Sequence, residues 1–140
     1  MKMAGEQWEK IQHFKPHEWG QWQSVSAGLI FAVDALRDLA GIACVIHCAF
    51  ATSGHSVGSA HYRGLAADLH LVGLSVVDQF LLAEKLNVFA GIGVYPHWNK
   101  PGLHVDLAEP GRRWIRTTAP VSSTRAYIPL DWANLKKECE

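Results

Sequence analysis

Two short segments of this chain alternate apolar and polar residues, and each has a carboxylate and a histidine on its polar side. Residues 65–71 (LAADLHL) and 103–108 (LHVDLA) show the period of two that is typical of a half-buried strand. The titratable residues on the polar side are Asp68, His70, His104 and Asp106. Acid and imidazole groups that share a partly buried face need a compensating partner, and a divalent cation supplies one.

Helical and strand patterns flank these two segments. Residues 23–40 repeat apolar positions with a helical period, and Gly41 is well placed to end that helix. Further helices are expected at residues 5–12, 75–87 and 130–138, and further strands at 43–50 and 89–96. Residues 51–64 are small, polar and rich in glycine, and a loop of that length is usually functional. Residues 13–20 are predicted to be a loop, and the tail from residue 109 is predicted to be irregular.

Gly91 and Gly93 stand in the apolar segment FAGIGVYP. Glycine inside a strand often marks a place where another group approaches the backbone closely. We therefore expect these two residues to lie against a side chain or a ligand.

Length and charge exclude several classes of protein. The 140 residues fit a single domain, 1–140. Lys plus Arg equals Asp plus Glu at 13 each, so neither a nucleic-acid nor a membrane partner is indicated by charge. We expect a monomer whose partner is recognised by shape and local chemistry.

The N-terminal residues 1–14 contain no apolar core and no small-residue cleavage site of the kind found in signal peptides. We therefore expect the chain to be cytoplasmic as synthesised. A substrate outside the cell would then require release by another protein, such as the pore that accompanies a phage or prophage lysin.

The cysteines are odd in number and predict no disulfide framework. Cys44 and Cys48 bracket His47 in the predicted strand 43–50, which at first sight resembles a metal cluster. In a regular strand, residues four apart are separated by roughly 13 Å, too far to share one zinc ion. We therefore predict that both cysteines belong to the core.

A zinc site is predicted from three residues on different segments. His61 ends the glycine-rich loop, Asp68 lies in the middle of one strand, and His104 can come from a neighbouring strand. Zinc binds imidazole nitrogen and carboxylate oxygen readily, and three protein ligands plus water is the usual catalytic arrangement. Each residue taken alone would be an ordinary polar residue.

The segment 59–68 resembles the S-x-H-x-x-G-x-A-x-D motif of zinc peptidases that act on peptidoglycan. These are the D-alanyl-D-alanine carboxypeptidases with the related dipeptidases, phage endolysins and murein endopeptidases. Residues 93–96 (GVYP) and 103–106 (LHVD) are similar to the G-x-Y-P and V-H-V-D segments of that family. Residues 14–19 and Arg113-Trp114 are similar to the opening and the closing Arg-Trp of small single-domain members.

This resemblance, which covers about residues 14–114, implies a fold and a function. His61, Asp68 and His104 would bind Zn²⁺. The implied fold is α+β, with a small antiparallel sheet, helices packed on one face and the zinc site on the other. The implied activity is hydrolysis of an amide bond in peptidoglycan stem peptides or cross-links, by a carboxypeptidase or an endopeptidase.

The chain departs from the family pattern where a general base is expected. Many members have an acidic residue three positions before the last histidine ligand, and others have a histidine two positions before it. Pro101 and Gly102 occupy these positions here. The substitutes are Asp106, which is either a base or a partner that orients His104, and His97.

Substrate contacts also differ from the family pattern. Ala51 stands where the family often has an arginine that contacts substrate. Ser59, Arg63 and Tyr95 are therefore the candidate substrate-binding residues. The remaining histidines, His47, His55 and His70, are expected to be structural or exposed, and His70 is a candidate partner of a ligand.

Two other functions remain open at this point. A module that keeps the zinc but only binds cell-wall peptide would explain the missing base and the missing arginine. A zinc hydrolase or lyase that acts on a small amide unrelated to the cell wall is the third hypothesis.

Overall fold

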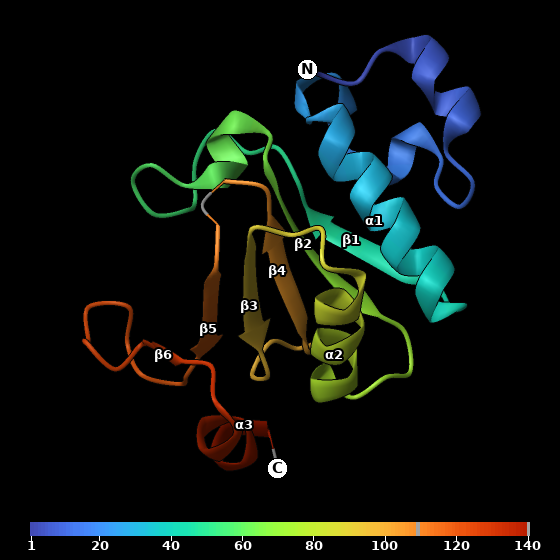
Figure 1. The fold of residues 1–140 in the computed structure, drawn as a ribbon. Helices are drawn as coiled ribbons and strands as arrows, with labels where there is room; N and C mark the ends of the chain where they lie inside the picture. The colour runs from blue at the N-terminus through green and yellow to red at the C-terminus, as the bar shows by residue number, and fades with distance from the viewer. Residues whose placement is uncertain (109, 140) are drawn as a thin grey trace.

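The predicted strands assemble into one mixed sheet (Figure 1). The computed structural model describes residues 1–108 and 110–139. The strand order is β1-β2-β4-β3-β5-β6. The strands are β1 (Cys44–Cys48), β2 (Ala66–Leu71), β3 (Gly91–Tyr95), β4 (Gly102–Asp106), β5 (Arg112–Arg116) and β6 (Tyr127–Pro129). Neighbours are antiparallel except for β3 and β5, which are parallel. The predicted α+β class is confirmed, with a sheet that is mostly antiparallel.

Helices form where the apolar period is helical. The described α-helices are α1 (Ala27–Ala40), α2 (Val76–Leu86) and α3 (Trp132–Cys139), and the 3-10 segments are η1 (Gly5–Lys10), η2 (Pro16–Trp19), η3 (Trp22–Ser24) and η4 (Ala60–Arg63). Helix α1 begins four residues later than predicted, because η3 and an extended Ser26 precede it. It ends at Gly41, whose left-handed backbone (φ 67°) suits glycine.

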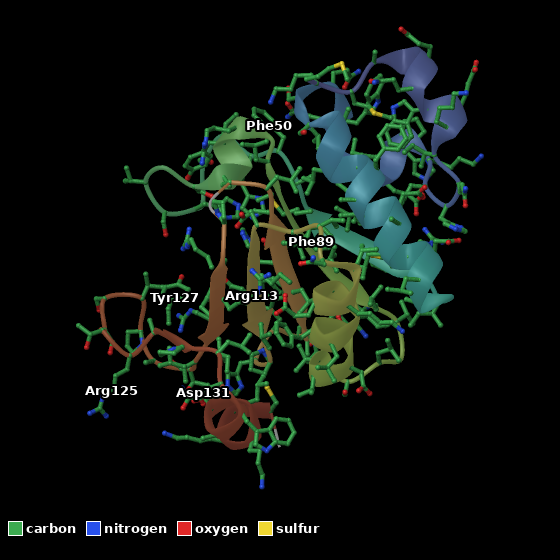
Figure 2. The ribbon with its side chains drawn as sticks, in the orientation of Figure 1. Phe50, Phe89, Arg113, Arg125, Tyr127 and Asp131 are labelled. Carbon is green, nitrogen blue, oxygen red and sulfur yellow. The ribbon has the colours of Figure 1, made fainter. Side chains whose placement is uncertain are left out.

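Helices α1 and α2 pack on the apolar face of the sheet. Leu69 of β2, Val105 of β4 and Ile92 of β3 are fully buried there, together with Leu29 and Ile30 of α1. Burying each of these side chains contributes about 1.5–3 kcal/mol. Arg113 of β5 also reaches α2, where its Nε donates to Glu84 at 2.9 Å (Figure 2). The opposite face of the sheet is therefore left for polar side chains.

The N-terminal segment supports the end of the long loop. Lys2 Nζ donates to the carbonyl oxygens of Ser24 and Arg63, at 2.9 and 2.6 Å. The backbone N–H of Ser26 donates to the Gly64 carbonyl at 2.8 Å. Gly64 has φ 69°, and a Cβ at this position would collide with the Ser24 carbonyl oxygen. Only glycine allows this approach, which fixes the position of η4 against the start of α1.

The prediction of an irregular tail was wrong, since β5 and β6 lie in it. Strand β5 has the sequence RRWIR, in which only Ile115 is fully buried. Its other side chains are long and polar or aromatic, so the strand has a weak apolar alternation. It is nevertheless held by parallel pairing with β3 and antiparallel pairing with β6.

Candidate metal centre

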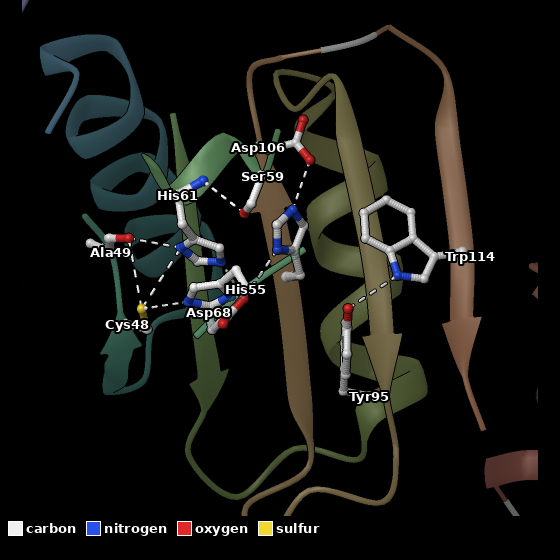
Figure 3. Close-up of polar contacts among 10 residues, drawn as sticks. Cys48, Ala49, His55, Ser59, His61, Asp68, Tyr95, Asp106 and Trp114 are labelled. Atoms are coloured by element: carbon white, nitrogen blue, oxygen red, sulfur yellow. Dashed lines mark hydrogen bonds and ion pairs between the residues drawn. The ribbon is translucent and has the colours of Figure 1, made fainter. Parts of the chain in front are cut away.

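The three predicted zinc ligands meet at one carboxylate oxygen on the polar face of the sheet (Figure 3). His61 Nε2 lies 3.2 Å from Asp68 Oδ1, and His104 Nδ1 lies 3.1 Å from the same oxygen. Asp68 and His104 are direct partners across β2 and β4. Because a strand alternates its side chains, this register places both groups on the same face.

The His61 ring is oriented by its other nitrogen. Residue 61 lies in η4, and its backbone N–H donates to Ser59 Oγ at 3.2 Å, which caps this short segment. Its Nδ1 donates to the Ala49 carbonyl oxygen at 2.7 Å, and the side chain is 2% exposed. With Nδ1 protonated for this hydrogen bond, Nε2 carries the lone pair that can bind a metal ion.

His104 is oriented in the same way by a carboxylate. Its Nε2 donates to Asp106 Oδ2 at 2.8 Å, which leaves Nδ1 directed at Asp68. Asp106 is 2% exposed, and its Oδ1 accepts from the backbone N–H of Ala108 at 3.0 Å. A carboxylate that holds the far nitrogen of a ligand histidine is the usual arrangement around a protein-bound metal.

Gly91 and Gly93 make room for these groups, as the sequence predicted. A Cβ at Gly91 would collide with the Asp106 carboxylate, and a Cβ at Gly93 would collide with the indole ring of Trp114. Gly93 is the direct partner of His104 in β4 and of Trp114 in β5. The Trp114 indole therefore covers Gly93 beside the His104 imidazole, and the ring centroids are 5.1 Å apart.

Replacement of Gly91 by alanine is expected to destabilise the fold by about 1–3 kcal/mol, because the new methyl group overlaps the buried Asp106 side chain. Urea unfolding in the presence of a chelator would measure this loss. Gly5→Ala is the matched control, since a Cβ there has no neighbour within 4 Å. Equal stability of the two variants would contradict the close packing of Asp106.

Cys48 joins the polar face, although the sequence predicted a core residue. Pairing of β1 with β2 is regular from Cys44 to Ile46 and then shifts, so that Cys48 is opposite Asp68. This β-bulge inserts His47 as an extra residue and turns Cys48 away from the core. Cys44, before the bulge, is buried as predicted, and burial raises the pKa of its thiol to about 12.

His55 also reaches the centre, although a structural or exposed role was expected. Its ring stacks on His61 with centroids 4.1 Å apart, and its Nε2 lies 3.5 Å from Cys48 Sγ. The backbone of His55 is held by Tyr62, whose hydroxyl accepts from His55 N–H at 2.9 Å and donates to His55 C=O at 2.7 Å. Cys48, His55, His61 and Asp68 form a group whose ligand atoms lie within 4.8 Å of one another, and this group could hold a metal ion.

Opposite charges are balanced within the centre. Burial opposes the charged form of His61, but hydrogen bonds to Asp68 and Cys48 outweigh it and raise the His61 pKa to about 10. Burial likewise opposes the charge of Asp68, while the hydrogen bonds from His104 and His61 lower its pKa to about 2. Against the same opposing effect of burial, the hydrogen bond to Asp106 raises the pKa of His104. The protons on these rings compensate carboxylate charge, which a divalent cation would also do.

The centre lies in a cleft of about 940 Å³ that also contains the candidate substrate residues Ser59, Arg63 and Tyr95. Tyr95 stacks on Trp98 with ring centroids 4.2 Å apart, and its hydroxyl accepts from Trp114 Nε1 at 3.3 Å. Burial raises the Tyr95 pKa to about 12, so the hydroxyl stays protonated at neutral pH. The cleft wall is therefore aromatic on the side of β3 and β5.

The structure does not bring His97 to the cleft. His97 Nε2 lies 2.9 Å from Glu138 Oε2 of α3, and its side chain is 36% exposed. His47 and His70 share the polar face with Asp68 and form a separate stacked pair, with 2.6 Å between His47 Nε2 and His70 Nδ1. Of the two candidate bases, only Asp106 is near the predicted ligands.

Within residues 1–108 and 110–139, no helix combines the length and the apolar character needed to cross a membrane. No model of a known protein family, no curated protein and no solved structure matches this chain. The resemblance to peptidoglycan peptidases therefore rests on the sequence motifs at residues 59–68, 93–96 and 103–106.

Proposed function

We propose that this protein is a zinc-dependent amidohydrolase that cuts peptide bonds in peptidoglycan stem peptides or cross-links. The observation that carries this proposal is the convergence of His61 Nε2 and His104 Nδ1 on Asp68 Oδ1. The far nitrogen of each ring has its own acceptor, the Ala49 carbonyl for His61 and Asp106 for His104. Two histidines and one carboxylate that leave a fourth position for water are typical of catalytic zinc sites, which supports the proposal.

Each residue of the centre has a distinct role in this function. His61, Asp68 and His104 would hold the ion. A zinc ion held by them would supply a water of lowered pKa, about 7 in place of about 15.7, and would polarise the scissile carbonyl. Asp106 would accept the hydrogen bond of His104 Nε2, so that Nδ1 is the nitrogen that would bind the ion. Tyr95, with its protonated hydroxyl in the cleft, is placed to donate a hydrogen bond to the substrate.

The cleft supports a peptide as the substrate. A volume of about 940 Å³ lies in the range of sites that enclose a small ligand or a short peptide segment. Arg63, exposed at the end of η4, lines the cleft and offers a cation for a substrate carboxylate in place of the arginine expected at Ala51. The choice of peptidoglycan rests on the sequence motif of residues 59–68.

A second function, a zinc-containing module that binds cell-wall peptide without cutting it, is favoured by one feature of the cleft. Asp68 and Asp106 are the only carboxylates among its described lining residues, and both are hydrogen-bonded to histidines. The family position of a base histidine is also closed, because a Cβ at Gly102 would collide with the Leu69 carbonyl oxygen.

The test combines metal analysis with cleavage of purified peptidoglycan. Protein purified without added zinc is expected to contain about one zinc ion per chain and to release peptide fragments. Chelation should stop the cleavage, and added zinc should restore it. If the protein contains one zinc ion per chain but cuts no peptide, the result would contradict the peptidase and support the binding module.

Replacement of His97 by glutamine is expected to change the cleavage rate by less than about twofold. His97 is exposed and contacts Glu138, and substitutions at such surface positions usually cost no more than about 0.5 kcal/mol. Steady-state cleavage of a soluble stem peptide would measure the rate. A loss of a hundredfold would restore His97 as the candidate base.

A further inference from the structure

Two sets of donors overlap in the metal centre. One consists of the three predicted ligands, and the other consists of Cys48, His55, His61 and Asp68. His61 and Asp68 belong to both sets. The two sets differ in whether the thiol of Cys48 or the imidazole of His104 completes the site.

We propose that Cys48 and His55 are metal ligands, which together with His61 and Asp68 form a closed, four-donor zinc site in the resting protein. Four protein donors are typical of zinc sites without an exchangeable water, whereas three donors plus water are typical of catalysis. In the proposed enzyme, catalysis would use His104 and a water in place of Cys48 and His55. The inference rests on the metal site of the proposed function and is independent of peptide cleavage.

The distances support this second set. Zinc–sulfur and zinc–nitrogen bonds of about 2.3 and 2.0–2.1 Å place tetrahedral donors roughly 3.5 Å apart. Cys48 Sγ lies 3.5 Å from His55 Nε2, and His61 Nε2 lies 3.2 Å from Asp68 Oδ1. These two pairs have nearly the spacing of a zinc shell, and all four ligand atoms lie within 4.8 Å of one another.

The surrounding structure holds Cys48 and His55 toward the centre. The bulge in β1 gives Cys48 its place opposite Asp68, where a regular strand would have turned it into the core. His55 lies in an otherwise exposed loop, and the two hydrogen bonds with Tyr62 keep it half-buried over His61. Gly54 and Gly58 have positive φ angles, which allow the chain to turn on either side of His55.

Cobalt(II) substitution tests the inference without reference to activity. A cobalt–thiolate bond gives a charge-transfer band in the near ultraviolet that nitrogen and oxygen donors do not give. We expect the reduced wild-type protein with one cobalt ion to show this band. Cys48→Ser should abolish it, and Cys139→Ser, in which a cysteine of α3 is changed, is the matched control that should keep it.

Two further variants separate the donor sets. His104→Gln should keep both the cobalt ion and the band, because the closed site does not use His104. His55→Gln should weaken cobalt binding by about 10-fold or more, measured by competition with a coloured chelator. This variant also replaces Cys48→Ser as the test if the serine variant does not fold.

Several results would overturn the inference. These are cobalt binding to the wild type without the band, persistence of the band in Cys48→Ser, loss of cobalt from His104→Gln, and unchanged affinity in His55→Gln. A chain that binds no cobalt would contradict both the closed site and the proposed enzyme. A thiolate band without peptidoglycan cleavage would support the closed site and contradict the peptidase.

Discussion

Replacing His61 by glutamine is expected to remove zinc binding and peptide cleavage together. His61 belongs to both donor sets, so its replacement removes one ligand from each of them. Glutamine can still donate to the Ala49 carbonyl, and its size is close to that of histidine, but its amide is a poor zinc ligand. Zinc affinity should fall by more than about 100-fold, since even partners behind the ligands contribute 10–100-fold. Cleavage should fall to the uncatalysed background.

Three measurements would check this result. Metal analysis gives the zinc content, a cleavage assay gives the rate, and thermal unfolding reports metal binding independently. Zinc at 100 times its Kd stabilises the wild type by about 2.7 kcal/mol, and this gain should be absent in the variant. His13→Gln is the matched control, because His13 lies near the N-terminus and contacts Asp38. Retention of zinc by His61→Gln would contradict both the centre and the proposed function.

The strand alternation predicted which side chains of β2 and β4 share the polar face. A period of two determines which side chains share a face, and Asp68 and His104 are direct partners across β2 and β4. The glycines at 91 and 93 were also informative, because a strand interior has few other uses for them.

The two additional donors could not be predicted from the same pattern. Cys48 reaches the polar face through a bulge, and the sequence of β1 contains no glycine or proline that would indicate one. His55 is positioned by the Tyr62 hydroxyl, a contact between loop residues that periodicity does not describe. One signal in the sequence pointed to His55: it lies beside Gly54 in the long glycine-rich loop, and a loop of that kind was predicted to be functional.

Strand β5 was missed for a different reason. Its sequence is typical of an exposed tail because it contains Arg112, Arg113 and Arg116. The pairing with β3 nevertheless holds the strand in the sheet. Tertiary pairing of this kind overrides a local pattern that lacks apolar residues.

Replacing Asp106 by alanine and by asparagine is expected to separate the two roles that the sequence left open. If Asp106 orients His104, alanine should lower the cleavage rate by about 10–100-fold. Asparagine retains one acceptor oxygen for either His104 Nε2–H or Ala108 N–H, so this variant should recover activity to within about tenfold of the wild type. Kinetics on a soluble stem peptide would measure the cleavage rate of each variant, and zinc competition would measure its metal affinity.

If Asp106 were instead a general base, the alanine and asparagine variants would lose activity in a different pattern. Neither alanine nor asparagine can accept a proton, so both variants would lose about 10²–10⁴-fold in rate while they keep their zinc. The acidic limb of the kcat/KM profile would also disappear if it reported Asp106. The structure favours the orienting role, because Asp106 is 2% exposed and both of its oxygens already accept hydrogen bonds within the protein. Partial rescue by asparagine with an unchanged acidic limb would therefore place Asp106 behind the metal ligand, whereas equal loss in the two variants would place it at the reacting water.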